Sequence, residues 1–170
     1  MTLNIRSITI MASVAAVYVA FTVSLAPIGF GSVQFRLAES LNLLVFFNPI
    51  FAPAVVLGVL IANLLSSPYG IIDVVLGTGA SLVAVLLILA TKKLTNNLFI
   101  ASLWPTIVNA LVIPLVILIG MGDSITLVPY LSFAISVGIG QFMVVTVFGY
   151  TLCRVLTAKN PNFIEMLKNI

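Results

Sequence analysis

The stretch from Ile71 to Thr91, IIDVVLGTGASLVAVLLILAT, contains a single charged residue, Asp73, and is followed directly by Lys92 and Lys93. A transmembrane α-helix needs about 20 consecutive, mostly apolar residues to cross the hydrocarbon core of a bilayer. This stretch meets that requirement, and its end is marked by two charges. It therefore predicts a membrane-spanning helix and makes an integral membrane protein the first hypothesis for the whole chain.

The composition agrees with that hypothesis and excludes several functions. Of the 170 residues, 62% are apolar and only 6% are charged, whereas a soluble domain carries about 25% charged residues. Seven basic residues are too few and too scattered for a nucleic-acid surface. The chain has no histidine and one cysteine, Cys153, so we expect neither a metal site nor a disulfide, and we expect no cofactor. It also lacks a Walker-type glycine loop, so we do not expect it to be an enzyme that hydrolyses ATP.

Prolines, glycines and charges divide the chain into apolar segments. The first segment is longer than the apolar core of a signal peptide, so we expect it to remain as a span. The second is short for a span, and prolines 105 and 114 should kink the fifth. The expected helices cover Ile8–Ala26, Arg36–Phe47, Pro49–Leu65, Ile71–Thr91, Leu98–Ile119 and Pro129–Leu156. The predicted fold class is thus an all-α integral membrane protein, a bundle of about six transmembrane helices forming one domain over residues 1–170.

The distribution of basic residues predicts the orientation. Cytoplasmic loops of membrane proteins carry an excess of Lys and Arg. With the N-terminus in the cytoplasm and six crossings, Arg36 alone falls outside. The basic residues that then fall inside are Arg6, Lys92, Lys93, Arg154, Lys159 and Lys168. Both termini are therefore expected in the cytoplasm, with the tail, Thr157–Ile170, forming a short amphipathic end near the membrane surface.

One polar stretch, Gln34–Asn42 (QFRLAESLN), stands out among the apolar segments. Arg36, Glu39 and Asn42 are three residues apart, so on a helix they form one slowly turning stripe. A charge at the bilayer centre costs about 2.5–3.5 kcal/mol on insertion scales, so such residues normally face the interior of a bundle. Two interpretations are open. Arg36 and Glu39 could pair with each other at the water interface, or Glu39 could face an outward-open pocket and bind a ligand.

Other polar residues favour the second interpretation when they are taken together. Asn63 and Asp73 are expected near outer helix ends, and Asn109 and Gln141 lie deeper in their helices. Each amide offers both a donor and an acceptor. Any one of them could simply make a helix–helix hydrogen bond. As a set with Glu39, they predict a shared polar cavity.

A separate surface is suggested on the first helix. Ala12, Ala16 and Ala20 are four residues apart and form a face of small side chains. Small residues allow another helix to approach closely in lipid. The neighbouring helix could belong to a partner protein or to this chain itself.

At this point the sequence resembles a known family. The run Leu25–Leu41, LAPIGFGSVQFRLAESL, resembles the QueT family, the queuosine-precursor transporters, and so do Leu57–Leu65 and Pro68–Gly77. The resemblance extends over about residues 13 to 149, and its most specific part is the QFRLAE block that begins at Gln34.

The resemblance implies a role and a set of partners. Members of this family are expected to be substrate-binding S components of energy-coupling factor (ECF) transporters in the plasma membrane. Such six-helix proteins capture a vitamin-like solute from outside, with high affinity. A separate transmembrane coupling protein and two ATPases drive transport. Their docking surface is commonly a small-residue face on the first helix, which here corresponds to Ala12, Ala16 and Ala20.

The implied ligand is a 7-deazaguanine, either a queuosine precursor or queuine. The guanine-like edge carries neighbouring N–H and amino donors that one carboxylate can accept together. Glu39 is the first candidate for that role, and Asp73 is either the alternative or the partner of a cationic aminomethyl group. Arg36 could hold Glu39 in place or close the outer loop. The remaining candidates for substrate contacts are Gln34, Asn63, Asn109 and Gln141.

Three alternatives stay open at this stage. The chain could be an S component for another small vitamin. It could be a membrane assembly protein that binds no ligand. It could also be a stand-alone secondary carrier, although it lacks the paired halves that many such carriers show.

Overall fold

The computed structural model describes residues 4–31, 33–160, 162, 165 and 167, and within these residues all regular structure is helical. The prediction of an all-α chain is therefore confirmed. Elements η2 and η3 are π-helical turns and η1 is a 3₁₀-helix. In chain order the elements are α1 (Ile5–Ser24), α2 (Ala26–Gly29), η1 (Leu37–Leu43), α3 (Leu44–Phe47), α4 (Phe51–Ser66), η2 (Asp73–Gly77), α5 (Thr78–Leu94), α6 (Leu98–Met121), α7 (Leu127–Gln141), η3 (Phe142–Gly149) and α8 (Tyr150–Lys159).

Four continuous helical segments are long and apolar enough to cross a membrane. They are Ile5–Ser24, Asp73–Leu94, Leu98–Met121 and Leu127–Lys159. These segments correspond to four of the six predicted spans, with ends shifted by a few residues. The other two predicted spans are shorter apolar helices, Leu37–Phe47 and Phe51–Ser66.

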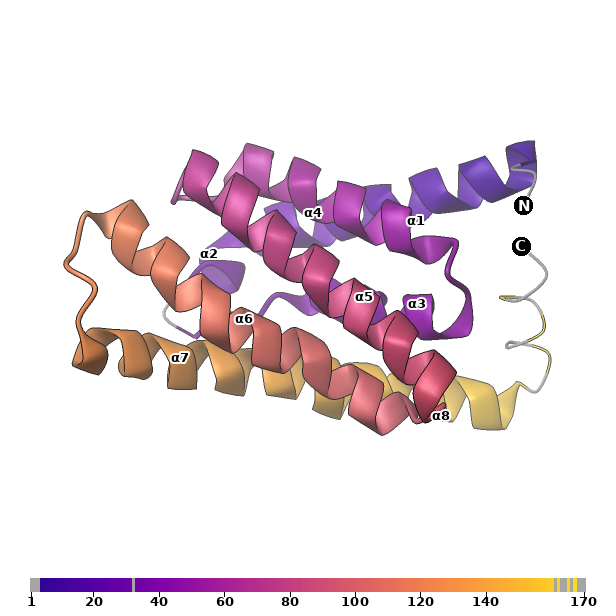
Figure 1. Cartoon of the computed structure of the whole chain (residues 1–170). Coiled ribbons are helices and arrows are strands. Elements are labelled where there is room, and N and C mark those ends of the chain that lie inside the picture. The colour runs from indigo at the N-terminus through magenta and orange to yellow at the C-terminus, as the bar shows by residue number, and fades with distance from the viewer. Residues whose placement is uncertain (1–3, 32, 161, 163–164, 166, 168–170) are drawn as a thin grey trace.

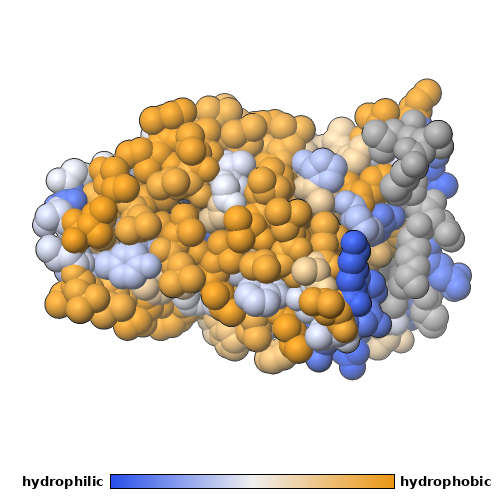
Figure 2. Space-filling model, in the orientation of Figure 1, coloured by the Kyte–Doolittle hydropathy of each residue, from blue (hydrophilic) through white to orange (hydrophobic). Residues whose placement is uncertain are grey.

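The surface of the molecule suits a lipid environment. Large apolar side chains are exposed along all four long segments, whereas soluble monomers rarely expose apolar patches of more than a few hundred Å². Figure 2 shows this apolar surface covering most of the visible face, with hydrophilic side chains gathered mainly at one end. Figure 1 shows that α1 begins and α8 ends at that same end.

The second predicted helix is built differently from a regular span. The 3₁₀-helix η1 continues into one turn of α-helix, α3. A 3₁₀-helix rises about 2.0 Å per residue against about 1.5 Å for an α-helix, so this short segment reaches further than its length suggests. It also has about 3 residues per turn, which aligns side chains three positions apart. Because η1 packs against α1, α6 and η3, that aligned row lies inside the bundle.

Two π-helical turns interrupt the long helices. They cover Asp73–Gly77 and Phe142–Gly149 and were not predicted, because a local widening of the helix leaves the apolar character of a segment unchanged. Prolines 105 and 114 lie inside the uninterrupted helix α6, and the kinks expected there remain a prediction.

The predicted C-terminal tail is described only in part. Thr157–Lys159 belong to α8, so the last long helix continues into the region predicted as tail. Leu167 is buried, and its backbone carbonyl accepts a hydrogen bond of 2.8 Å from Asn48 Nδ2. Residues 161, 163–164, 166 and 168–170, which include Lys168, lie outside the described residues.

Helices α1 and α4 approach each other closely at a glycine. A Cβ atom on Gly58 would lie 2.9 Å from Cβ of Tyr18 and 3.3 Å from the backbone oxygen of Ala15. Both neighbours are buried and cannot move aside easily. The glycine thus allows the close packing that places Tyr18 in the interior.

The first prediction concerns this contact. Gly58→Ala should lower the stability of the detergent-solubilised protein by about 1–3 kcal/mol, the usual cost of overpacking. Thermal unfolding followed by circular dichroism measures the change. Gly79→Ala is the matched control, because a Cβ at Gly79 meets nothing within 4 Å. If Gly58→Ala melted at the same temperature as the unmodified protein, or at a higher one, the close packing of α1 against α4 would be contradicted.

Candidate functional site

Three charged side chains lie in the interior of the bundle. Arg36 is 4% exposed, and Glu39 and Asp73 are each 1% exposed. Charged residues are almost never fully buried unless they are paired. The partners of these three residues therefore define the candidate site.

Glu39 is held by hydrogen bonds to both of its carboxylate oxygens. The hydroxyl of Tyr18, on α1, donates to Oε1 at 2.7 Å, and the amide of Asn42 donates to Oε2. Glu39 and Asn42 are three residues apart on η1, so the 3₁₀ geometry brings them into line. Tyr18 was not among the residues predicted for the site. A signal was available, since a tyrosine in the middle of a span needs a partner for its hydroxyl.

Arg36 pairs with Asp73 and not with Glu39. Nη2 of Arg36 lies 3.0 Å from Oδ2 of Asp73, and Oγ of Ser67 donates to the same oxygen at 2.7 Å. The guanidinium also lies over the ring of Phe30, 4.3 Å from its centroid. The interpretation in which Arg36 and Glu39 form an ion pair at the water interface is therefore wrong.

Asp73 is the first residue of the π-helical turn η2, and its carboxylate lies against Gly77, the last residue of that turn. A Cβ on Gly77 would clash with Oδ1 of Asp73 and would lie 3.1 Å from Nδ2 of Asn63. Only glycine leaves room for both groups at that position. Nδ2 of Asn63 donates to the backbone carbonyl of Asp73 at 3.1 Å, which links α4 to the turn. π-Helical turns are often found at functional sites.

Several buried polar atoms of this region have no hydrogen-bond partner among the described residues. Leaving a buried donor or acceptor unpaired costs about 1–3 kcal/mol, so such atoms need an explanation, and one is a ligand that pairs with them. The atoms are Oε1 and Nε2 of Gln34, Nε of Arg36, Oδ1 of Asn42, Oδ1 of Asn63, Oδ1 of Asp73, and Oε1 and Nε2 of Gln141.

The other predicted residues are buried but make no hydrogen bond to the charged groups among the described residues. Gln34, Asn109 and Gln141 are all buried. A Cβ on Gly140 would lie 2.6 Å from the backbone oxygen of Gln34, so this backbone packs tightly beside Gln141. In the part of the chain that the structure describes, no hydrogen bond joins these three amides to Glu39 or Asp73.

The charged side chains of the site have almost no access to the surface. Glu39 is buried, and five cavities of about 200–620 Å³ among the described residues are lined by other side chains. The outward-open pocket expected at Glu39 stays a prediction. The hydroxyl of Tyr69 donates to the backbone carbonyl of Phe30 at 3.4 Å, and the Tyr69 ring packs where a side chain on Gly120 would clash. Burial, reinforced by the negative charge of Asp73, raises the pKa of the Tyr69 phenol.

The small-residue face of α1 lies on the outside of the bundle. Ala12, Ala16 and Ala20 are exposed and line an apolar groove of about 620 Å³ between α1 and α4. The close contact with α4 uses Ala15 and Gly58 instead. Packing within the chain therefore does not account for this face.

Comparison with known proteins connects these features to a family. A family model described as QueT transporter matches residues 8–158. A curated relative, the Queuosine precursor transporter QueT of Lactococcus lactis subsp. cremoris (strain MG1363), is 41% identical over 78 residues. These residues make up 45% of this chain and 45% of the relative, so the aligned part spans less than half of that protein. No solved structure matched the chain.

The buried ion pair generates the second prediction. Arg36→Met and Asp73→Asn should each destabilise the protein by about 3–5 kcal/mol, because each leaves one buried charge without its partner. The double variant should be less destabilised than the sum of the two, since neither charge remains. Unfolding in detergent, followed by circular dichroism, measures all three. Strict additivity would show that the pair is not coupled.

Proposed function

The chain belongs to the QueT transporter family, and on that premise we propose that it is the membrane-embedded binding subunit, the S component, of an ECF transporter for a queuosine precursor or queuine. We further propose that it crosses the plasma membrane six times as one domain, with both termini in the cytoplasm. The protein binds its solute from outside with high affinity.

Two observations support this topology. The four long apolar segments would make six crossings if the two shorter apolar helices also cross, and the start of α1 lies at the same end as the end of α8 (Figure 1). Hydrophilic side chains gather at that end in Figure 2. Lys92, in the last turn of α5, and Arg154, on α8, line one cavity together. The gathering of these basic residues at one end agrees with the positive-inside rule.

The observation that carries the proposed ligand is the set of buried polar atoms without partners. Each carboxylate oxygen can accept two hydrogen bonds. Glu39 can therefore keep Tyr18 and Asn42 and still accept the N–H and amino donors of a deazaguanine edge. Oδ1 of Asp73 is available to a cationic aminomethyl group. The amides of Gln34, Asn63, Asn109 and Gln141 supply donors and acceptors for the carbonyl and ring nitrogens.

The proposed access route leads past Phe30 and Tyr69. These two residues are joined by one long hydrogen bond of 3.4 Å, and Phe30 covers the Arg36 guanidinium. Separation of Phe30 from Tyr69 would open the site towards the outside. Arg36 would then help to hold the site closed, because its ion pair with Asp73 joins the residue before η1 to the start of η2.

The energy for transport is proposed to come from partner subunits. The apolar groove lined by Ala12, Ala16 and Ala20 is the proposed docking surface for a transmembrane coupling protein, which two ATPases drive. The absence of a Walker-type loop from the chain supports a separate motor.

The third prediction tests the ligand. Glu39→Gln should weaken binding of a 7-deazaguanine by about 100-fold, because the amide replaces an acceptor with a donor facing the donors of the ligand. Isothermal titration of the purified chain with queuine and its precursors measures the affinity. Asp123→Asn, an exposed acid in the connection between α6 and α7, is the control and should bind as the unmodified chain does.

The alternatives predict other outcomes of the same titration. Binding of another vitamin, with none of deazaguanines, would replace the proposed substrate. No binding of any solute by folded protein would favour a membrane assembly protein. Uptake by the chain alone in vesicles, without ATPases, would favour a secondary carrier.

The fourth prediction tests docking. Ala16→Trp should abolish copurification of the coupling protein and its ATPases, since a large side chain prevents close helix approach. Deazaguanine binding should be unchanged, because Ala16 points away from the site. Val17→Trp, at the neighbouring exposed position, is the matched control. Loss of the partners from both variants would remove the assignment of this face.

A further inference from the structure

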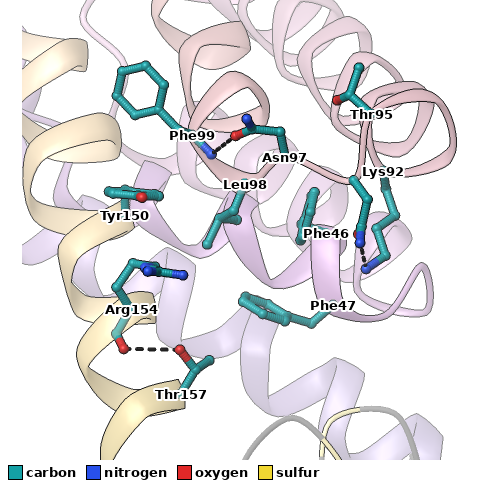
Figure 3. Close-up of a pocket in the computed structure, with 11 residues that line it drawn as sticks. Phe46, Phe47, Lys92, Thr95, Asn97, Leu98, Phe99, Tyr150, Arg154 and Thr157 are labelled. Atoms are coloured by element: carbon teal, nitrogen blue, oxygen red, sulfur yellow. Dashed lines mark hydrogen bonds between the residues drawn. The ribbon is translucent and has the colours of Figure 1, made fainter.

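A second polar feature lies at the other end of the bundle, where α5 passes into α6. It is a cavity of about 530 Å³ that opens to the surface through exposed residues such as Asn97 and Arg154. Figure 3 shows its lining from three parts of the chain: α3, the connection between α5 and α6, and α8. None of its lining residues belongs to the candidate substrate site.

The connection between α5 and α6 builds one wall of this cavity. Lys92 lies in the last turn of α5, where the helix dipole favours a cation. Asn96 then adopts a left-handed conformation, with φ of 49°, which ends the helix. Asn97 caps α6, its side chain accepting hydrogen bonds from the backbone N–H groups of Phe99 and Ile100. The positive end of the α6 dipole therefore also lies at the cavity.

Two cations from different helices line the cavity, and none of the lining residues is acidic. Lys92 Nζ donates to Oδ1 of Asn96 at 2.8 Å and lies 4.5 Å from the centroid of the Phe46 ring. Arg154, on α8, is exposed. A guanidinium presents five donors in a planar fork that matches phosphate. The charge of the cavity thus selects an anion.

The remaining walls are aromatic and lead to the lipid-facing surface. Phe46 and Phe47 form an edge-to-face pair with centroids 5.7 Å apart. Phe99 and Tyr150 form a second such pair at 5.6 Å. Phe99 is 45% exposed, and both α6 and α8 carry further exposed apolar side chains. A ligand with an anionic head and an apolar body fits this combination better than a free anion does.

We propose that this cavity binds the phosphate headgroup of an anionic phospholipid, with the acyl chains running over the apolar surface beside Phe99. Basic pockets between transmembrane helices bind anionic lipid headgroups in this way. The cavity lies where α5 ends and α6 begins, and the ends of membrane-spanning helices are the level at which headgroups lie. The proposal does not depend on the transport function proposed above.

Native mass spectrometry of the full chain in a neutral detergent tests the proposal. The probes are dioleoylphosphatidylglycerol and dioleoylphosphatidylcholine, which share their acyl chains and differ in net charge. The chain should retain phosphatidylglycerol preferentially. Lys92→Gln/Arg154→Gln should weaken that binding on the order of tenfold or more. Lys93→Gln/Lys159→Gln removes the same charge from exposed residues of the same two helices that do not line the cavity, and it should have little effect.

Three results would overturn the proposal. These are equal retention of both lipids, equal losses in the two double variants, and displacement of phosphatidylglycerol by inorganic phosphate at the same concentration. The last result would identify a free anion as the ligand. Arg154→Gln alone is a control for misfolding, because this exposed side chain can be replaced without disturbing the core. This single variant should lose part of the phosphatidylglycerol binding. Lys92→Arg keeps the charge and should retain the lipid.

Discussion

The burial of Arg36 and Asp73 as an ion pair is the constraint on which the rest of the interior depends. A bundle surrounded by lipid offers no bulk water to charged groups, so each charge must be satisfied by the protein or by a ligand. The pair joins the residue before η1 to the start of the second long segment, Asp73–Leu94. Glu39 is satisfied from α1 and η1. The charges therefore fix the relative positions of segments that apolar packing alone would leave free to slide.

Local departures from α-helical geometry make this arrangement possible. The 3₁₀ turns of η1 align Glu39 with Asn42, and the π-helical turn at Asp73 leaves a carboxylate beside a glycine. Regular α-helices at both places would rotate these side chains out of line. The irregular backbone is tolerated inside the membrane because other helices surround it.

The long spans, the short second helix and most of the buried polar residues could be predicted from the sequence, because apolar length and isolated charges are visible there. The partner of Arg36 could not. Asp73 is 37 positions away, and the order of residues does not show which helices become neighbours. The need of the Tyr18 hydroxyl for a partner is visible in the sequence, but the identity of that partner, Glu39, is not. The 3₁₀ and π turns were missed because they change the pitch of a helix without changing its composition.

Helix α1 is one continuous helix with two different faces. Its inner side presents the Tyr18 hydroxyl to Glu39, while its outer side presents Ala16 and Ala20 to the surroundings. Tilting or sliding this helix must lengthen or realign the bond from Tyr18. Thermodynamic linkage makes such an effect reciprocal: if the proposed partner on the outer side moved α1, it would change the affinity for the proposed solute, and a bound solute would change the affinity for the partner by the same factor.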